Sequence, residues 1–425
     1  MKEQLKCGER SILILDTSYT LKMFKERHLE RALESRKLGG YFRTVISVHP
    51  LVGLFETGDA RFGNAVINRL DASHLFIEGK IGCSRFLNLL PPLNFILAQI
   101  KLIILIIKLS RIYKVKFIRI GDPYYLGLIG VLLSYILKVP LVSRIGFRFD
   151  EIVRITGKPV LARLFKYRWI EKKVERYVFH RCDLIAGANE DNMQYAIENG
   201  GNIKNATIFR YGNLIHASHW QELETRQSPD YLLADLGISG ERFAITVARL
   251  EPMKYVEDAV RAFAEIHKRG HLIKWVVVGD GVLKGKLQEL ATQLGVSGEI
   301  CFAGNRTQEW LASVLPRATM VISPHMGRAL AEAALASLPI VAFDYDWQRE
   351  VVIDGRTGYL VPHQDWLGLS DKIECVLLDQ KGAREMGKNA RELVLEMMDP
   401  NKLETHEQNE YTKLFERFFV NAAIT

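Results

Sequence analysis

Short apolar runs alternate with helical patterns along the chain, and this alternation predicts its secondary structure. Apolar, largely β-branched runs that end at Gly, Pro or Asp are typical of buried strands. In the first half the predicted strands are Ser11–Leu15, Tyr41–Val48, His74–Ile77, Phe117–Ile120, Leu141–Ser143, Asp183–Ala188 and Thr207–Arg210. In the second half they are Phe243–Ala248, Leu272–Val278, Ile300–Ala303, Met320–Ile322 and Ile340–Phe343. Strands that alternate with helices favour an α/β fold with a parallel, doubly wound sheet in each half.

Helical patterns fill the intervals between these strands. The predicted helices are Leu21–Leu38, Leu126–Leu137, Pro159–Arg181, a helix that begins at Val256, Leu283–Leu294, Arg328–Ser337 and a final amphipathic stretch, Glu407–Val420. The segment Gln221–Asp230 is polar, contains Ser228-Pro229 and lacks apolar periodicity. We therefore interpret it as the connection between two domains.

The most apolar segment, Leu93–Leu109, allows two interpretations. It is short for a membrane span and carries Lys101 and Lys108, which share one stripe of a helix. The segment is either a helix buried against the sheet or an amphipathic helix in a membrane interface, where the basic residues that follow would assist it.

Charge is distributed unevenly along the chain, whose net charge is +8. Residues 1–200 contain 32 Lys and Arg against 19 Asp and Glu, whereas residues 201–425 contain 25 against 30. No carboxylate occurs between Glu78 and Asp122. We expect the first half to meet an anionic partner such as a membrane surface or a phosphorylated substrate. Nucleic acid is not expected, because the chain shows no recognised nucleic-acid-binding module.

The cysteines are scattered and form no CxxC or Cys/His cluster; they are Cys7, Cys83, Cys182, Cys301 and Cys375. This pattern argues against a disulfide framework and a zinc site, and it favours a reducing cytoplasm. No basic-then-apolar leader precedes the first strand. We therefore expect a cytoplasmic location, with peripheral contact to the cytoplasmic face of the membrane as a further expectation.

The stretch Met320–Val361 predicts a strand, a loop, a helix and a second strand, which together form a βαβ unit. Ligands of open α/β sheets bind at the carboxyl ends of the strands. The loops His325–Gly327 and Asp344–Trp347 are therefore expected at a ligand site. Glu332 is the only carboxylate of the intervening helix, and in so apolar a helix it needs a partner, either an arginine or a ligand.

A second candidate site lies in Val247–Lys254, where a predicted strand runs into a loop with Arg249 and Lys254. Arginine binds phosphate oxygens in a fork, lysine adds a point charge, and the N-terminus of the following helix adds its dipole. These residues predict a diphosphate site; two solvated loop cations are the alternative.

Two strands of the second half end in glycine turns, Gly279–Gly281 and Gly304–Arg306. Glycines at a strand end let a backbone approach a nucleotide. Gly285 falls one place too late for GxGxxG, and no GxxxxGK[ST] loop is present. Asp344 and Asp346 spell DxD, but a three-residue pattern without a further acidic ligand does not predict a metal, and we expect none.

Five segments, in this order, resemble glycosyltransferase family 4, the retaining GT-B enzymes. They are VARLEPMK (Val247–Lys254), VVGDG (Val277–Gly281), FAG (Phe302–Gly304), SPHMGRALAEAALASLPIVA (Ser323–Ala342) and EVVIDGRTGYLVP (Glu350–Pro362). The resemblance implies the GT-B fold, in which two doubly wound Rossmann-like parallel-sheet domains face a central cleft. Residues 1–220 would bind the acceptor, residues 221–400 would bind the nucleotide sugar, and residues 401–425 would form a helix that crosses back to the first domain.

The resemblance also implies which residues bind the donor. Arg249 and Lys254 would contact its diphosphate, and Glu332 its ribose. The residues that would frame the base are Gly279, Gly281, Gly304, Asn305 and Arg306. The remaining donor-binding candidates are His325, Met326, Gly327 and Glu350.

Three positions differ from the family's pattern. The family has a second glutamate eight residues before the one that matches Glu332, and this chain has Pro324 there. It has a double glycine where this chain has Tyr345–Trp347, and a glycine loop near the N-terminus where this chain has Asp16–Tyr19. His325 is the candidate to replace the missing contact to the donor sugar.

The implied reaction is the transfer of a sugar, with retention, from a nucleoside-diphosphate sugar to an acceptor hydroxyl in glycan, polysaccharide or glycolipid biosynthesis. Arg249 and Lys254 would supply positive charge where the leaving diphosphate becomes negative, so neither a metal nor a cofactor is required. Arg144 and Asp122 are the further catalytic candidates. The acceptor would be a glycan or a lipid-linked, anionic molecule. The alternatives are a nucleotide-sugar epimerase on the same fold and a non-catalytic nucleotide-sugar-binding partner subunit.

Overall fold

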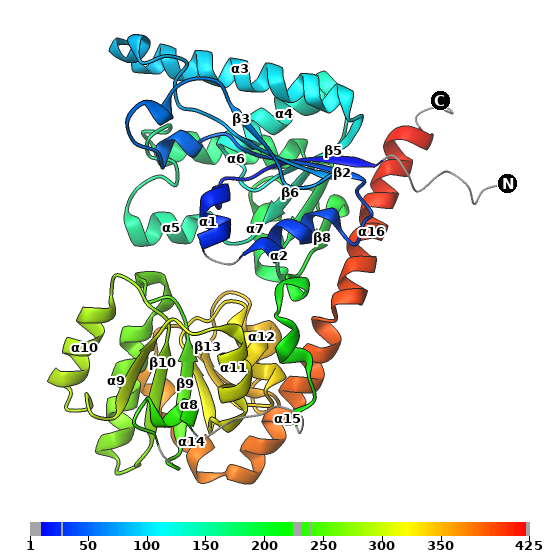
Figure 1. The fold of residues 1–425 in the computed structure, drawn as a ribbon. Helices are drawn as coiled ribbons and strands as arrows, with labels where there is room; N and C mark the ends of the chain where they lie inside the picture. The colour runs from blue at the N-terminus through cyan, green and yellow to red at the C-terminus, as the bar shows by residue number, and fades with distance from the viewer. Residues whose placement is uncertain (1–9, 27–28, 224–230, 239, 422–425) are drawn as a thin grey trace. The chain divides into compact units, whose positions relative to one another are not determined.

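The computed structural model describes residues 10–421, except 27–28, 224–230 and 239. The chain divides into two compact units (Figure 1), residues 1–214 with 400–425, and residues 215–399. The division falls after Leu214, ahead of the predicted boundary at residue 220. Most of the predicted connection Gln221–Asp230 lies outside the described residues.

The first unit is built on an eight-stranded sheet with the order β3-β4-β2-β1-β5-β6-β7-β8. Its strands are β1 (Ser11–Leu15), β2 (Thr44–His49), β3 (Val66–Arg69), β4 (His74–Glu78), β5 (Val115–Ile120), β6 (Leu141–Ile145), β7 (Leu184–Gly187) and β8 (Ala206–Ile208). Neighbouring strands are parallel except β3 and β4, so the predicted parallel sheet is confirmed. The edge strand β3 was missed because its side chains are mostly exposed and form no apolar run.

Helices cover both faces of this sheet (Figure 1). They are α1 (Leu21–Glu26), α2 (Glu30–Glu34), α3 (Pro91–Ile112), α4 (Tyr125–Leu137), α5 (Phe149–Thr156), α6 (Arg168–Arg181), α7 (Glu190–Glu198) and α16 (Pro400–Phe415). The helices α3, α4 and α6 contribute Leu102, Ile129 and Val178 to one core cluster. Tyr411 and Leu414 of α16 belong to a second cluster, which includes side chains of β1. The last helix of the chain therefore completes the core of the first unit.

The predicted helix Leu21–Leu38 is divided into the short helices α1 and α2. Phe24 of α1 and Leu33 of α2 both pack in one cluster with Phe76. Residues nine positions apart in a continuous helix point to opposite faces. The chain must therefore bend for both side chains to reach the same ring.

The predicted helix Pro159–Arg181 begins only at Arg168. The backbone N–H groups of Val160 and Leu161 donate to the carboxylate of Glu171, at 3.0 and 2.7 Å. Glu171 is fully buried and also pairs with Arg168 at 3.0 Å. A buried carboxylate needs such donors, and the segment before the helix supplies them by folding back.

The second unit contains a six-stranded sheet with the order β11-β10-β9-β12-β13-β14. Its strands are β9 (Phe243–Val247), β10 (Lys274–Val278), β11 (Ile300–Gly304), β12 (Met320–Ser323), β13 (Ile340–Phe343) and β14 (Gly358–Val361). Its helices are α8 (Tyr231–Ala234), α9 (Val256–Lys268), α10 (Lys284–Gln293), α11 (Gln308–Val314), α12 (Ala329–Leu335), α13 (Gln348–Val351), α14 (Trp366–Leu378) and α15 (Gln380–Met397). All neighbouring strands are parallel. The prediction for this half is confirmed, and the short strand β14 is an addition to it.

Each sheet has one strand from which the connections leave in opposite directions. This strand is β1, between β2 and β5, in the first unit, and β9, between β10 and β12, in the second. Ligands of open α/β sheets bind outside the carboxyl ends of the strands at such a switch point. These two edges are therefore the first places to look for a site.

Candidate active site

The loop after β9 packs directly on the loop after β10. A Cβ atom on Gly279 would lie 1.9 Å from the carbonyl oxygen of Ala248, and one on Gly281 would lie 2.4 Å from that of Leu250. Gly279 also has a φ of 130°, which favours glycine. Because these two glycines have no side chain, the backbone of the loop that carries Arg249 can pack against them. Their role in framing a base stays a prediction.

Arg249 and Lys254 both lie in this loop, before the N-terminus of α9. The Arg249 side chain is 63% exposed and pairs with Glu251 at 2.9 Å. The pKa of Lys254 is lowered to about 8, mainly by burial and then by the charge of Arg249, while the charge of Asp346 opposes the shift. The two cations therefore repel each other in the free protein. A bound anion would relieve this repulsion.

His325, in the loop after β12, joins the loops after β9 and β13. Its Nδ1 lies 2.7 Å from the carbonyl oxygen of Met253, and its Nε2 lies 3.1 Å from Oδ2 of Asp346. Both partners are acceptors, so a ring with a proton on each nitrogen satisfies both. His325 is 8% exposed. The ring therefore acts as a link between loops of the candidate donor site.

Aromatic rings fill the space beside His325. Tyr345 stacks on His363 with ring centroids 4.3 Å apart, and it meets His325 edge-on at 4.8 Å. Tyr255 meets His363 edge-on at 4.5 Å. The family's double glycine corresponds to the segment that contains Tyr345 and Asp346. This chain therefore has bulky and charged side chains where the resemblance leads us to expect none.

Gln348, which the sequence analysis missed, holds the loop after β12. Its side chain is fully buried. Its amide nitrogen donates to the carbonyl oxygen of Phe343 at 2.8 Å, and its amide oxygen accepts from the Met326 N–H at 3.1 Å and from the Ser323 hydroxyl. No local pattern distinguishes this glutamine, because only the fold brings it against the loop.

The remaining donor candidates near this loop differ in exposure. Met326 is fully buried, its N–H donates to Gln348, and its carbonyl oxygen accepts from Nε1 of Trp347 at 3.2 Å. Met326 therefore supports the loop, and its contact with a donor stays a prediction. Gly327 is exposed just before α12, and Glu350 is half-buried on α13. Their contacts with a donor stay predictions.

The turn after β11 is open to solvent. Gly304 has a φ of 68° and accepts a hydrogen bond from the N–H of Gly279 at 2.8 Å. The two predicted glycine turns are therefore joined. Asn305 and Arg306 are exposed, and the Arg306 guanidinium lies 5.3 Å from the ring centroid of Trp310. These side chains are accessible to a ligand.

Glu332 is 2% exposed and has an arginine partner. Its Oε1 lies 3.3 Å from Nε of Arg328, and its Oε2 lies 4.0 Å from Nε2 of His219. Burial raises the pKa of Glu332, and Arg328 opposes the shift. This geometry meets the requirement for a partner without a ligand. The contact of Glu332 with ribose stays a prediction.

The two aspartates of the DxD pattern have separate partners. Asp344 pairs with Arg349 at 2.9 Å, and Asp346 pairs with His325. Within the part of the chain that the structure describes, no three His, Cys, Asp or Glu side chains are grouped so that they could hold a metal ion.

A cavity of about 350 Å³ lies at the switch point of the first unit's sheet. Its lining includes Arg36, Arg119, Arg144 and Asp16. Asp16 pairs with Arg36 at 2.5 Å, and Glu407 of α16 lies 3.6 Å from Arg119 and 3.4 Å from Arg144. Three guanidinium groups thus share two carboxylates, which leaves an excess of positive charge beside the cavity.

The two catalytic candidates of the first unit have different roles. Arg144 borders the cavity and lies on β6, which extends beyond the predicted end of this strand at Ser143. Asp122 is not among the residues that line the cavity. Its Oδ1 accepts from the N–H groups of Tyr124 and Leu126, at 2.9 and 3.3 Å, and burial raises its pKa to about 7. Asp122 therefore caps the N-terminus of α4, and its catalytic role stays a prediction.

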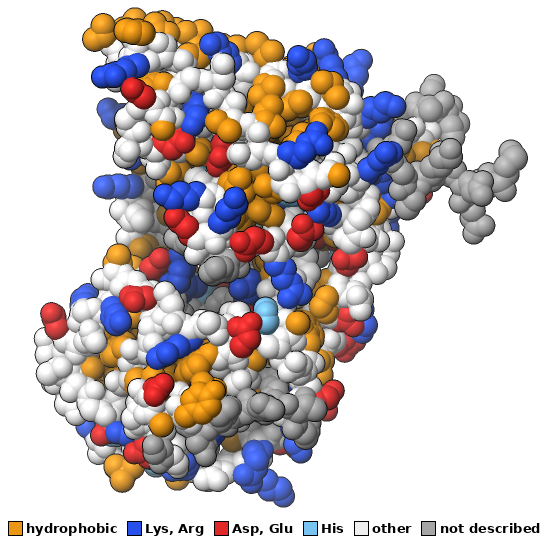
Figure 2. Space-filling view, in the orientation of Figure 1, with side chains coloured by type: hydrophobic (Ala, Val, Ile, Leu, Met, Phe, Trp, Pro, Cys, Tyr) orange, Lys and Arg blue, Asp and Glu red, His pale blue; other side chains and the backbone are white. Residues whose placement is uncertain are grey.

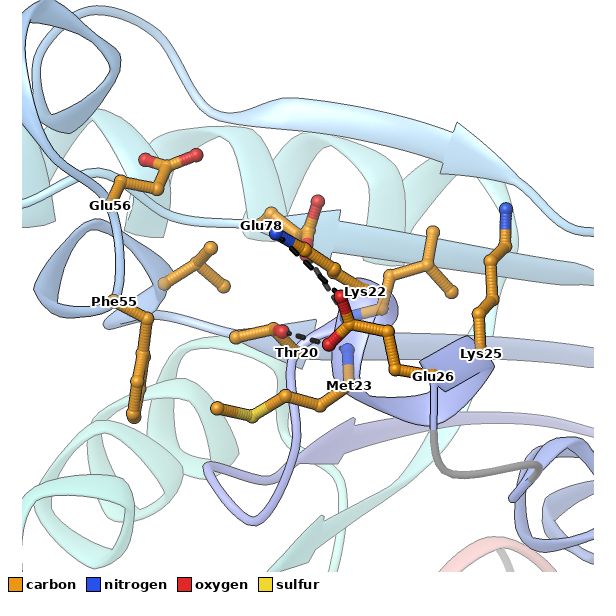
Figure 3. A pocket seen from close by; sticks show the side chains of 10 residues that line it. Thr20, Lys22, Met23, Lys25, Glu26, Phe55, Glu56 and Glu78 are labelled. Atoms are coloured by element: carbon orange, nitrogen blue, oxygen red, sulfur yellow. Dashed lines mark hydrogen bonds and ion pairs between the residues drawn. The ribbon is translucent and has the colours of Figure 1, made fainter.

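A separate pocket of about 490 Å³ lies beside α1 (Figure 3). Two carboxylates of its wall have partners: Glu56 pairs with Lys80 at 2.8 Å, and Glu78 accepts from the N–H of Leu21 at 3.1 Å. No predicted site residue is among those that line it. We therefore assign it no part in the candidate site.

Two α/β units, each built on a largely parallel sheet, are the architecture of the GT-B fold. Among solved structures, Anabaena HepE in complex with UDP and glucose is similar, with a TM-score of 0.66 and 16% identity over 95% of this chain and 100% of that chain. This similarity shows the fold. Residues 233–393 match the family described as glycosyl transferases group 1. The chain therefore has the GT-B fold, and the part of it that matches the group 1 glycosyl transferases lies within the second unit.

Curated relatives match part of the chain. The chain is 25% identical over 181 residues to alpha-D-kanosaminyltransferase of Streptomyces kanamyceticus, across 42% of this chain and 47% of the relative. It is 31% identical over 169 residues to D-inositol 3-phosphate glycosyltransferase of Nocardia farcinica, a match that covers 37% of this chain and 38% of the relative. The chain thus spans less than half the length of these relatives. The predicted GT-B fold is confirmed.

Proposed function

We propose that this chain transfers a sugar, with retention, from a nucleoside-diphosphate sugar to an acceptor hydroxyl. The position of Arg249 and Lys254 at the switch point of the second sheet carries the proposal. Both side chains precede α9, a helix of 13 residues. Two cations beside a helix N-terminus are suited to a diphosphate. The arginine guanidinium can bond two phosphate oxygens, and the lysine charge and the helix dipole attract the same anion.

Departure of the diphosphate is the electrostatic problem of this reaction. The bond between the anomeric carbon and the diphosphate oxygen breaks, so negative charge develops on the leaving group. Arg249 and Lys254 would stabilise that charge in a partly desolvated site. With a pKa of about 8, Lys254 is mostly charged at neutral pH. The two cations supply the positive charge that this step needs, and we propose neither a metal nor a cofactor.

The nucleoside is assigned to the open turn after β11 and to Glu332. Asn305 and Arg306 are exposed there. UDP is the first nucleotide to test, because the similar HepE structure contains it. In a contact with ribose, a hydroxyl group would donate to Oε2 of Glu332 while Oε1 keeps its bond with Arg328. His325 is proposed to act on the donor sugar in place of the family's glutamate.

The acceptor is assigned to the cavity of the first unit. The excess positive charge of Arg36, Arg119 and Arg144 over Asp16 and Glu407 suits an acceptor with a phosphate or carboxylate group. The Nocardia relative is named for D-inositol 3-phosphate, a phosphorylated compound. We propose a glycan or lipid-linked acceptor of glycan, polysaccharide or glycolipid biosynthesis, met in the cytoplasm or at the cytoplasmic face of the membrane.

A second candidate function is that of a non-catalytic nucleotide-sugar-binding subunit. Pro324 stands where the resemblance leads us to expect a glutamate, and Tyr345 and the His325–Asp346 pair lie beside it in the loops after β12 and β13. Such a protein would bind a nucleotide without turning over its sugar. Release of nucleoside diphosphate from a donor, measured with and without acceptors, separates this function from that of a transferase.

Thermal unfolding with UDP, GDP, ADP or CDP tests the donor site directly. A ligand at a hundredfold its dissociation constant adds about 2.7 kcal/mol to the free energy of unfolding. One nucleotide should stabilise the wild type but neither Arg249→Ala nor Lys254→Ala. Lys268→Ala is the matched control, because Lys268 is 65% exposed at the far end of α9. A protein that no nucleotide stabilises would contradict the donor site.

A further inference from the structure

An exposed apolar face extends along one side of the first unit. Phe86 and Leu89, in the short helical turn before α3, are 91% and 92% exposed. The face continues along α3 with exposed side chains at helical spacing. We call these residues the α3 face: Phe86, Leu89, Leu93, Ile96, Ile100 and Ile104. Soluble proteins rarely leave so contiguous an apolar surface uncovered unless it binds something.

The opposite side of α3 belongs to the core. Leu102 and Ile106 are almost fully buried in the cluster that packs on the sheet. By length and composition, α3 is apolar enough to cross a membrane. Only 33% of its most apolar 18-residue window is buried inside the protein. Each of the two interpretations of Leu93–Leu109 thus describes one side of the helix: one side is core, and the other is free to meet an apolar partner.

Basic side chains border this apolar surface. Lys101 and Lys108 are exposed on α3 and lie seven residues apart, so they share one stripe of the helix. Figure 2 shows hydrophobic side chains gathered over α3, with Lys and Arg beside them. Because no carboxylate occurs between Glu78 and Asp122, nothing nearby in the sequence balances this charge. The partner of the face should therefore be both apolar and anionic.

We propose that the α3 face docks on the surface of an anionic lipid bilayer. Phe86 and Leu89 would enter the boundary between head groups and acyl chains, while Lys101 and Lys108 would lie at the level of the lipid phosphates. The helix would lie along the surface and would not cross the bilayer, because Leu102 and Ile106 hold its other side on the sheet. The inference rests on the first unit alone and does not depend on the donor site.

Cosedimentation with vesicles tests this surface. The wild type should bind vesicles of phosphatidylcholine with about one third phosphatidylglycerol, and it should bind pure phosphatidylcholine at least about tenfold more weakly. Binding should weaken in about 1 M salt, where the Debye length falls to about 3 Å. Replacing Lys101 and Lys108 by Gln should remove most of this salt dependence.

A matched pair of variants identifies the face. Leu89→Asp should weaken binding to the anionic vesicles at least about tenfold, because it places a charge where an apolar side chain enters the bilayer. Leu272→Asp should bind like the wild type, since Leu272 is similarly exposed, at 83%, but lies on the second unit. Thermal unfolding without nucleotide checks that both variants fold, so this test stays separate from that of the donor site.

Three outcomes would overturn the inference. The first is a wild type that binds neither kind of vesicle. The second is equal binding by Leu89→Asp and Leu272→Asp. The third is self-association of the wild type in gel filtration, without vesicle binding, that Leu89→Asp abolishes; the α3 face would then be an interface between two copies of the chain.

Discussion

Nε2 of His325 and Oδ2 of Asp346 are 3.1 Å apart, and this contact joins the loops after β12 and β13. The same ring bonds Met253, which precedes Lys254. Asp346 has a φ of 54°, a conformation that a residue other than glycine adopts where its surroundings compensate the strain. One histidine thus connects the loop of the diphosphate-binding candidates with the loop that replaces the family's double glycine.

Loss of this contact should destabilise the second unit. His325→Ala should lower the free energy of unfolding by about 1–3 kcal/mol, because Asp346 and the Met253 carbonyl lose a buried partner. In the His325→Ala background, Asp346→Ala should have a smaller effect than in the wild type, with a coupling of about 1 kcal/mol. Urea unfolding of the single and double variants measures this coupling. Strictly additive effects would show that the two side chains act independently.

Nucleotide binding should depend on pH through Lys254. Burial lowers the pKa of Lys254 from 10.5 to about 8, so the free protein loses this positive charge as the pH rises through 8. Affinity for the nucleoside diphosphate should then fall, by at most about tenfold per pH unit. Lys254→Arg stays charged and should show a flatter profile. Calorimetric titration between about pH 7 and pH 10 compares the two.

The lowered pKa of Lys254 also predicts how the stability of the protein changes with pH. Between about pH 8 and pH 10.5, Lys254 binds a proton in the unfolded chain but not in the folded one. Stability rises with pH wherever the unfolded state binds more protons. The free energy of unfolding should therefore rise more with pH in the wild type than in Lys254→Arg over this range. An equal rise in both proteins would assign the effect to other groups.

Two glycines of the second unit, one tightly packed and one not, should respond differently to replacement by alanine. Gly281→Ala should destabilise the protein, because the new Cβ would lie 2.4 Å from the backbone oxygen of Leu250. Gly285 lies in α10, where a new Cβ would meet no packed neighbour within 4 Å, so Gly285→Ala should stabilise the helix by about 1 kcal/mol. Thermal unfolding of both variants shows whether tight packing distinguishes the two positions. Similar effects of the two substitutions would contradict the assigned packing.

Glu407 should contribute more to stability than its neighbours on α16. Glu407→Ala leaves Arg119 and Arg144 without their shared carboxylate in a buried site, and it should lower the free energy of unfolding by about 3–5 kcal/mol. Glu410→Ala is the control, because Glu410 pairs with Lys413, which is 71% exposed. That substitution should change stability by less than about 1 kcal/mol. Urea unfolding measures both, and equal losses would contradict the buried network.

Local sequence determined most of the secondary structure of this protein. Strands such as Ser11–Leu15 and Ile340–Phe343 were predicted at their observed bounds, because short apolar runs between turn residues are only stable when buried in a sheet. The alternation of strands and helices led to the parallel sheets, and the order of the motifs led to the GT-B fold. Arg249 and Lys254 were found in the same way, since both lie in one short loop between a strand and a helix.

Only the tertiary structure decided what the individual polar side chains contact. Asp122 caps a helix, Met326 is buried beneath its own loop, and Gln348 bonds residues far from it in the sequence. Glu407 meets Arg144 across 263 positions of the chain. A local pattern reports which residues share a strand or a helix face, whereas hydrogen bonds and ion pairs depend on distances of a few ångström between segments that only folding brings together.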